Sequence, residues 1–496
     1  MNKKDSKKKS LEEKNFGKKN LDIVFINPPL SQEERYGIKF KAGGQTPPTG
    51  LALLAAVCRE KNYSVAIIDA PAINLNSDQV LDKILELKPK YVGITAVTIS
   101  LFNAIDIAKL LKEKYPQGKI ILGGAHITAA PKETVERFGM FFDIAVLGEG
   151  ELTIIDLLKT LNHKKPLSDV KGIAYPDETG KHLIFTPPRE FVEDLDSLPF
   201  PAYDLLPDLA KHYSPPVHTV KRFPVALLMT SRGCPGLCTF CDNKVFGRKL
   251  RCNSADYVIK LILHLKKTYG IKEIQFRDDN FLVFRKRTIE LCEKIIKKKI
   301  DIVWSCAGRV DMITPEVLRL MKKAGCWQIW YGVESGSDRI LTKIKKNTSQ
   351  EKIARAIIET KKAGISPGGF FMIGMPTETE ADIKKTIDTL LKLPLDEFHI
   401  SHLTPFPGSE IYASASQYGY FDNDWKKMSG WKTIFVPKGL SKKKLVYYSD
   451  YAFRKFYFRP RIIFNYVKRI KSWRHLQTYF MAFRGFLSFI KLKERD

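Results

Sequence analysis

Two runs of alternating apolar and helical segments limit the folds open to this chain more than any other feature. The first run holds five short apolar segments predicted as strands, at 22–27, 65–70, 91–97, 119–124 and 143–148. Stretches with helical periodicity separate these segments. Strands that alternate with helices predict a parallel doubly wound sheet, so we expect a Rossmann-like α/β domain. Such a sheet binds ligands at the carboxyl ends of its strands.

The second run starts near residue 225 and repeats the same alternation. Its predicted strands lie at 225–231, 273–279, 302–308, 327–335, 369–375 and 397–403. Helical stretches fill the intervals between them. Six successive units of this kind predict a partial (β/α)6 TIM-like barrel, in which the chemistry gathers at the carboxyl ends of the strands.

With 496 residues, the chain exceeds one ordinary domain. A Pro-rich stretch between the two runs cannot continue helices and is interpreted as a linker with a small β extension. The predicted division is a disordered basic tail at 1–20, the Rossmann-like domain at 21–163, the linker at 164–221, the barrel at 222–440 and a helical C-terminal region at 441–496.

The formal net charge of +28 is concentrated partly at the two ends. The first twenty residues hold eight Lys against three acids and no apolar run, which indicates a disordered tail rather than a signal peptide. No apolar run approaches the roughly 20 residues that span a bilayer, so we expect a cytoplasmic protein. Nucleic-acid binding is not expected, because no RNA-recognition motif is visible.

The region 441–496 interleaves aromatic residues with fifteen Lys or Arg residues, against three acids. Two interpretations of it stay open. Its helices could pack on the barrel and leave a basic face in solvent. Alternatively, its aromatic and cationic side chains could make a peripheral contact with an anionic membrane surface.

Three of the eight cysteines, Cys234, Cys238 and Cys241, follow the first barrel strand with the spacing CxxxCxxC. In a long chain without a secretion signal, clustered thiols indicate metal ligation rather than disulfides. Three thiolates do not complete a tetrahedral zinc site, but they can hold a 4Fe-4S cluster and leave one iron open. A zinc loop with a distant fourth ligand is the alternative.

This cysteine motif resembles that of the radical S-adenosylmethionine (SAM) superfamily, with Phe240 in the aromatic position before the last cysteine. The resemblance covers about 225–440. It implies that the open iron binds the amino and carboxylate groups of SAM. It also implies that an electron donor such as flavodoxin or ferredoxin drives cleavage of SAM to methionine and a 5′-deoxyadenosyl radical, which takes hydrogen from a substrate.

Other strand ends match SAM-binding positions of the same superfamily. Asp278 and Asp279 stand where the superfamily usually has GGE, and they are candidate acceptors for the SAM ammonium group. A solvated loop with Asn280 as a helix cap is the alternative. The resemblance also implies positions near the SAM ribose and carboxylate for Ser305 and Arg309, and a polar position near SAM for Glu334. It implies contact with the adenine for Ile373 and Gly374.

A Rossmann-like domain placed before such a barrel resembles the cobalamin-binding subgroup of the superfamily. Glycine-rich strand ends would let a large ligand approach the backbone closely. The candidate cobalamin-binding residues are Thr95, Ser100, Gly123, Gly124, His126, Gly148 and Glu149. The cobalt-ligating His of many cobalamin proteins is missing, because residues 27–30 read NPPL. We expect His126 to line the pocket rather than bind cobalt. A domain that binds nothing is the alternative.

Together the two resemblances imply a cobalamin-dependent radical methylase. It would methylate an unactivated carbon or phosphorus centre of a small-molecule or lipid-like substrate, using one SAM as the methyl source and a second as the radical source. The same architecture also serves oxidative cyclisation and rearrangement, and the sequence does not distinguish these outcomes. RNA modification is a further class, but no RNA-binding barrel is visible.

Overall fold

The computed structural model describes residues 19–37, 43–177, 179, 182–213, 215–216 and 219–469. The chain divides into two compact units. Unit 1 comprises residues 1–35, 45–213 and 244–246, and unit 2 comprises 36–44, 214–243 and 247–496. The tail expected at 1–20 lies almost wholly outside the described residues, as does the C-terminal stretch 470–496.

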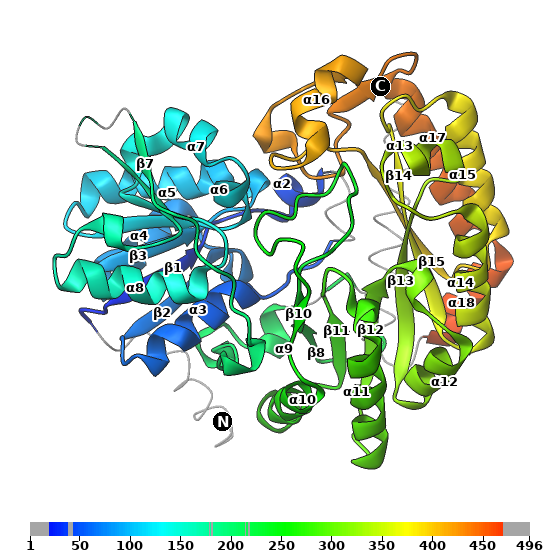
Figure 1. Ribbon diagram of the computed structural model, residues 1–496, viewed down its shortest axis with the longest axis horizontal. Coiled ribbons are helices and arrows are strands. Elements are labelled where there is room, and N and C mark those ends of the chain that lie inside the picture. The colour runs from blue at the N-terminus through cyan, green and yellow to red at the C-terminus, as the bar shows by residue number, and fades with distance from the viewer. Residues whose placement is uncertain are drawn as a thin grey trace, which may run out of the picture. The chain divides into compact units, whose positions relative to one another are not determined.

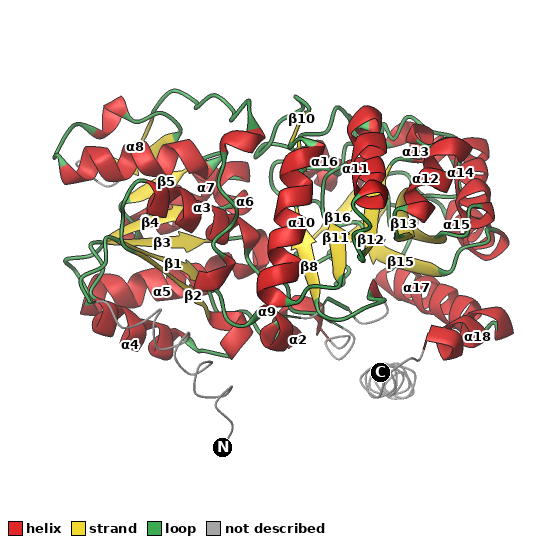
Figure 2. Cartoon of the chain, turned by 90° about the horizontal axis from the view of Figure 1, so that it is seen from below, coloured by secondary structure: helices red, strands yellow, loops and turns green. Residues whose placement is uncertain are grey.

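Unit 1 is built on a sheet with the strand order β2-β1-β3-β4-β5-β6-β7. The first five strands run parallel to one another and have the bounds β1 Ile23–Asn27, β2 Val65–Asp69, β3 Tyr91–Thr95, β4 Lys119–Gly123 and β5 Ile144–Val146. The Rossmann-like prediction is therefore confirmed. The main helices are α3 Thr49–Glu60, α4 Ser77–Leu87, α5 Leu101–Lys114, α7 Pro131–Phe138 and α8 Gly150–Asn162. Helix α3 packs beside α8 and α4 packs beside α5, on opposite faces of the sheet (Figure 2).

The stretch that follows α8 extends this sheet. Strands β6 Ile173–Pro176 and β7 Leu183–Phe185 add antiparallel to its edge, where the small β extension was expected. Further along, the Tyr213 hydroxyl donates a hydrogen bond of 2.5 Å to the buried Asp69 carboxylate at the end of β2. Asn27 donates to the same carboxylate at 2.8 Å, so the end of unit 1 is tied to the carboxyl ends of β1 and β2.

Unit 2 contains a parallel sheet with the described strand order β15-β14-β13-β12-β11-β8 (Figure 1). The bounds are β8 Val225–Leu228, β11 Glu273–Phe276, β12 Val303–Gly308, β13 Cys326–Glu334, β14 Ser366–Ile373 and β15 Glu397–His402. All neighbouring pairs are parallel, which confirms the expected partial barrel. The helices that connect them are α10 Ala255–Tyr269, α11 Arg285–Lys297, α12 Pro315–Lys323, α13 Asp338–Lys343, α14 Gln350–Lys362 and α15 Glu380–Lys392.

Alternate side chains of these strands point to opposite faces of the sheet. The helix-covered face is marked by Tyr331 of β13, whose hydroxyl lies 2.7 Å from Thr360 Oγ1 of α14. Trp304 belongs to the same face, since its Nε1 donates to the Ala324 carbonyl just after α12. Residues one position away, such as Ser305 and Trp330, therefore lie on the opposite, inner face.

The C-terminal part of unit 2 is helical, as expected. It comprises α16 Glu410–Tyr418, the hairpin of β16 Gly419–Phe421 and β17 Phe435–Pro437, then α17 Lys442–Tyr457 and α18 Pro460–Arg469. Helix α17 packs on α15 and β15. The rings of Phe453, Phe456 and Tyr457 lie 4.9, 4.7 and 5.4 Å from the ring of Phe398 in β15. The packed-helix interpretation therefore holds for α17.

Membrane contact by the same region stays a prediction. Six of the aromatic residues on which it depends lie outside the described residues: Trp473, Tyr479, Phe480, Phe483, Phe486 and Phe489. Within the described part of the chain, the longest apolar helices fall short of what would be needed to cross a bilayer.

Candidate active site and cofactor-binding edges

The three motif cysteines lie on a loop that starts at the carboxyl end of β8. The loop is closed by β9 Ser231–Arg232, which pairs antiparallel with β10 Arg251–Cys252. Gly233 has a φ of +89°, and a Cβ there would lie 2.1 Å from the Lys249 carbonyl oxygen, so only glycine fits. The Cys234 N–H donates to the Gly247 carbonyl at 3.3 Å. The backbone around the cysteines is thus fixed from both sides.

The thiols of Cys234 and Cys238 face a common point beside Gly236. A Cβ built on Gly236 would lie 3.4 Å from Cys234 Sγ and 3.9 Å from Cys238 Sγ. Among the described residues, no three Cys, His or acidic side chains converge closely enough to hold a single metal ion. A 4Fe-4S cluster has a different requirement, because each thiolate binds a different iron. Three thiolates on one loop can serve such a cluster.

Burial raises the pKa of the Cys238 thiol, so the bare thiolate is disfavoured at this position. A metal centre reverses that preference, since a coordinating thiol is deprotonated outright. Two half-buried cations stand beside the cysteines and favour the same charge state. The guanidinium of Arg309 would lie 4.0 Å from a Cβ at Gly236, and Lys346 lowers the Cys238 pKa electrostatically.

Lys346 is a site residue that the sequence analysis missed. Its Nζ lies 2.7 Å from Glu334 Oε1, and 5.9 Å from the ring centroid of Phe240 inside the cysteine loop. Burial alone would lower the Lys346 pKa, but the charges of Glu334 and Cys238 outweigh it and raise that pKa. The lysine comes twelve residues after Glu334 within a Lys-rich run, and α13 lies between them, so no simple spacing signals the pair.

Arg309 lies where it was expected, just after β12. Its Nε and Nη2 donate to the Asp311 carboxylate at 3.0 and 3.1 Å, and Nη2 also donates to the Asn347 carbonyl at 3.1 Å. Asn347 directly follows Lys346 in the chain. Both cations are therefore held against the cysteine loop by one connected set of contacts. Ser305 of β12 is largely buried on the inner face.

The two acids at the end of β11, Asp278 and Asp279, have different partners in the structure. Asp278 Oδ1 accepts from the N–H groups of Thr230 and Ser231, and Oδ2 accepts from Thr230 Oγ1 at 2.8 Å. Arg287 Nη2 completes this cluster at 3.4 Å from Oδ2, and both charged side chains are almost fully buried. Asp278 thus connects the end of β11 to the end of β8, and both of its carboxylate oxygens are engaged in these contacts.

Asp279 accepts a hydrogen bond from the Gly233 N–H at 3.2 Å, directly before Cys234. Its second carboxylate oxygen has no donor within the described residues, and it can accept from a ligand ammonium group. Asn280 stands at the N-cap position of the short 3-10 turn Phe281–Val283, but its side chain makes no capping bond there. Asn280 Oδ1 instead lies 3.4 Å from the Arg309 backbone nitrogen.

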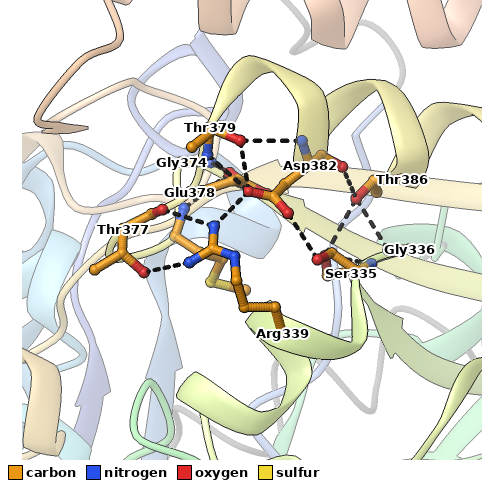
Figure 3. A network of polar contacts seen from close by, with 11 residues as sticks. Ser335, Gly336, Arg339, Gly374, Thr377, Glu378, Thr379, Asp382 and Thr386 are labelled. Atoms are coloured by element: carbon orange, nitrogen blue, oxygen red, sulfur yellow. Dashed lines mark hydrogen bonds and ion pairs between the residues drawn. The ribbon is translucent and has the colours of Figure 1, made fainter.

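The ends of β13 and β14 are joined by a polar network (Figure 3). The Gly336 N–H and the Ser335 hydroxyl contact Thr386 Oγ1 at 2.9 and 3.2 Å, and Thr386 belongs to α15. Arg339 donates to the Thr377 carbonyl at 2.9 Å and pairs with Asp382. These contacts fix the segment after Glu334, whose φ of +65° marks a strained turn at the end of β13.

Glu378 fixes the end of β14 in the same network. Its Oε2 accepts from the N–H groups of Gly374 and Met375 at 2.5 and 3.0 Å. Glu378 is 1% exposed, and burial raises its pKa to about 8. The side chain of Ile373 is fully buried in the core, and Gly374 is buried as well, so neither residue presents a side chain to a ligand at this strand end.

In unit 1, the carboxyl ends of β3 and β4 present bare backbone. Gly124 is exposed with a φ of +104°, and a Cβ there would lie 2.6 Å from the Ala96 carbonyl oxygen. Gly148, after β5, has open space where a Cβ would stand. Gly123 and Thr95 are half-buried between them. Such an edge can accept a large planar ligand at close approach.

The remaining expected residues of this edge serve the protein itself. His126 is 1% exposed, its Nδ1 lies 3.1 Å from Thr98 Oγ1, and burial lowers its pKa to about 4, so the imidazole is neutral near pH 7. Ser100 Oγ accepts from the Val97 N–H at 3.1 Å. Glu149 Oε2 accepts from the Val192 N–H at 3.0 Å. These side chains shape the edge from beneath.

Two family models match the chain. Residues 37–158 match the B12 binding domain, and residues 228–390 match the radical SAM superfamily. The first match falls mainly on unit 1. The second spans the cysteine loop and the strands β11 to β14 of unit 2.

Curated relatives match over most of the chain. An uncharacterised methyltransferase of Pyrococcus horikoshii is 33% identical over 89% of this chain and 94% of that protein. An anaerobic magnesium-protoporphyrin IX monomethyl ester cyclase of Rubrivivax gelatinosus is 30% identical over 79% of this chain and 69% of that protein. A cytidylyl-2-hydroxyethylphosphonate methyltransferase of Streptomyces wedmorensis is 28% identical over 76% of this chain and 79% of that protein.

Two solved structures share the fold. The cobalamin-dependent SAM radical enzyme OxsB has a TM-score of 0.68 at 20% identity, covering 88% of this chain and 66% of that chain. The radical SAM methyltransferase TsrM of Kitasatospora setae has a TM-score of 0.65 at 15% identity, covering 80% of this chain and 75% of that chain.

The neighbouring acids Asp278 and Asp279 give a matched pair of variants. Asp278→Ala leaves the Arg287 guanidinium buried without its partner, so we expect a loss of about 3–5 kcal/mol in unfolding free energy. Asp279→Ala removes a carboxylate with one backbone contact, and we expect a loss below about 1 kcal/mol. Urea unfolding of the full-length chain measures both losses. Equal losses for the two variants would contradict the assignment.

Glu378 predicts a pH dependence of stability. Its folded-state pKa of about 8 lies above the ordinary value of 4.5. The protonated carboxyl therefore stabilises the fold fully below that ordinary value, and this stabilisation is lost as the pH rises through about 8. We expect Glu378→Gln to flatten the stability curve between about pH 5 and 8. The exposed Glu351→Gln on α14 is the control, and its curve should follow the wild type. If the unfolding free energy of Glu378→Gln changed with pH as steeply as that of the wild type, the prediction would be wrong.

Proposed function

This chain belongs to the cobalamin-binding radical SAM enzymes, and from that premise we propose that it transfers a methyl group to an unactivated carbon or phosphorus centre of a small molecule. The observation that carries the proposal is the 33% identity over 94% of a protein named as a methyltransferase. The identity to a phosphonate methyltransferase over 79% of that protein supports the same reaction class.

The cofactors of this family are a 4Fe-4S cluster, SAM and cobalamin. Together they supply a 5′-deoxyadenosyl radical, released by reductive cleavage of SAM at the cluster, and a methyl group carried by cobalamin. A protein reductant such as flavodoxin or ferredoxin is the electron donor that we propose. The protein's own contribution is to bind these groups, exclude water and orient the substrate.

We assign the cluster to Cys234, Cys238 and Cys241. Their loop leaves no fourth thiol in the motif, so one iron stays open for SAM. The positive charges of Arg309 and Lys346 offset the negative charge of three thiolates in a partly buried site. The same cations also suit the carboxylate of SAM, while Asp279 suits its ammonium group.

In unit 1, the edge that we assign to the corrin ring is formed by the exposed Gly124 and the half-buried Gly148, which has open space where a Cβ would stand. We do not assign cobalt ligation to His126. A buried imidazole that already contacts Thr98 is a packing element beneath this edge, in keeping with its expected role in lining rather than ligation. We therefore assign this edge to close backbone contact with the corrin ring, and not to ligation of cobalt.

The adjacent residues Lys345 and Lys346 test the SAM assignment. Lys346→Met should weaken SAM binding by about tenfold or more, because it removes a half-buried cation beside the cysteines. Lys345 is half-exposed and pairs with Glu410, so Lys345→Met should change binding by less than about twofold. Equilibrium dialysis of the anaerobically reconstituted protein measures both.

Lys346→Arg keeps the positive charge and should restore most of the SAM affinity. This conservative variant separates a role of the charge from a general loss of structure. If Lys346→Met bound SAM as tightly as the wild type, the assignment would fall.

Methyl transfer has a readout that needs no acceptor substrate. With titanium(III) citrate as reductant, the reconstituted enzyme should convert SAM to S-adenosylhomocysteine in an amount equal to the bound cobalamin. Protein prepared without cobalamin is the control and should form none. If mass spectrometry found 5′-deoxyadenosine but no S-adenosylhomocysteine, methyl transfer would be contradicted and oxidative cyclisation or rearrangement favoured.

A further inference from the structure

A row of aromatic side chains crosses unit 2, apart from the residues assigned above. Trp330 of β13 stacks on Phe370 of β14, with ring centroids 4.8 Å apart and planes 26° apart. Phe370 meets His399 of β15 edge-on at 6.1 Å, and His399 meets Trp431 at 4.6 Å. Trp431 in turn lies 6.3 Å from Tyr36. These five residues form one continuous chain of ring contacts, called the aromatic row below.

The aromatic row lies on the inner face of the sheet, away from the helices. Tyr331, next to Trp330, contacts Thr360 of α14 on the helix-covered face. Phe398, next to His399, packs against α17 in the same way. Because neighbouring positions of a strand face opposite sides, Trp330 and His399 point to the inner side. Phe370 lies on the inner side as well, because its ring contacts both Trp330 and His399.

Two neighbours hold Trp330 in place within this row. A Cβ on Gly368 would lie 2.6 Å from the Trp330 ring, so glycine is required for the indole to lie flat on β14. The Trp330 indole N–H donates to Gln328 Oε1 at 2.9 Å. The ring at the start of the row is therefore preorganised rather than adaptable. Phe370, His399, Trp431 and Tyr36 are each half-buried.

The aromatic row begins beside the ion pair of the SAM site. Gly332 of β13 is the Cα partner of Phe370. A Cβ on Gly332 would lie 2.5 Å from both Glu334 Oε1 and Lys346 Nζ. The Glu334–Lys346 pair therefore lies against Gly332, the residue that is paired with Phe370 across the sheet. A molecule resting on the row would lie next to the place where the radical is generated.

Arg277 follows β11 directly and comes two residues after Gln275, the Cα partner of the inner-face Ser305, so it belongs to the same inner face as the aromatic row. Its side chain is exposed to solvent. Its Nη2 donates to Gln275 Oε1 at 2.7 Å, and no carboxylate of the described residues lies within ion-pair distance. The Arg277 guanidinium stays charged at neutral pH.

We propose that the substrate of this enzyme is a planar conjugated or aromatic ring that carries an anionic group. The ring would lie against Phe370 and His399, and the anion would pair with Arg277. Preorganised aromatic faces favour a flat partner through stacking, and an arginine without an internal carboxylate favours a carboxylate or phosphate partner. This inference rests on the proposed function, because it names the acceptor class of that reaction.

The test uses simple probes and the full-length protein loaded with its cofactors. Equilibrium dialysis would compare 2-naphthoate with the saturated decalin-2-carboxylate and with the neutral 2-naphthamide. We expect 2-naphthoate to bind about tenfold more tightly than either comparison compound, one lacking the flat ring and the other lacking the charge. This comparison needs no variant, so it does not depend on a mutant folding.

Matched variants then locate the binding. Phe370→Leu should weaken 2-naphthoate binding by about fivefold and Arg277→Gln by about tenfold. Tyr420→Leu and Arg319→Gln remove exposed counterparts on β16 and α12 and should leave binding unchanged. The inference is overturned if 2-naphthoate fails to bind below about 1 mM. It is also overturned if the saturated acid binds equally well, which would favour a lipid-like substrate, or if the row variants bind like their controls.

The two proposals fail separately. Formation of S-adenosylhomocysteine by the wild-type enzyme is measured without any acceptor, so methyl transfer can stand when the ring preference is absent. Conversely, a preference for 2-naphthoate that depends on Phe370 and Arg277 would support the substrate class even if no S-adenosylhomocysteine formed.

Discussion

Parallel strand pairing is the constraint on which the rest of this structure depends. When neighbouring strands run in one direction, their carboxyl ends meet at one edge, and every loop that leaves those ends is brought together. In unit 2 this places the cysteine loop after β8, Asp279 after β11, Arg309 after β12 and Glu334 in β13 at the same edge. Residues as far apart in the chain as Cys234 and Glu334 thereby share one site. In unit 1 the same rule gathers the glycines that follow β4 and β5.

The charge balance of the cysteine edge explains why its residues belong together. Burial disfavours a bare thiolate at Cys238, and burial also disfavours an isolated cation at Lys346. Each charge becomes tolerable because the other is near, and because Glu334 pairs with Lys346 at 2.7 Å. A metal centre that deprotonates the thiols completes this balance. We therefore expect binding of the cluster to be coupled to the order of the whole edge.

The sequence predicted the architecture well, because strand and helix periodicities are local signals. Each of the eleven parallel strands expected from apolar runs is present with shifts of a few residues at its ends. Side-chain partners are not local, and there the sequence was less informative. It treated Asp278 and Asp279 alike, although only the structure shows Asp278 held by Thr230 and Arg287. It missed Lys346 because the partner of that lysine lies on another element.

The central claim is that three thiolates hold a 4Fe-4S cluster whose fourth iron binds SAM. Electron-nuclear double resonance of the reduced full-length protein tests it most directly, using SAM labelled with ¹⁵N in its amino group and ¹⁷O in its carboxylate. The account predicts hyperfine coupling of both labels to the cluster, and loss of the signal when Cys234, Cys238 and Cys241 are all changed to Ala. A reduced cluster that shows no coupling to either label, or a chain that holds zinc in place of iron, would contradict it.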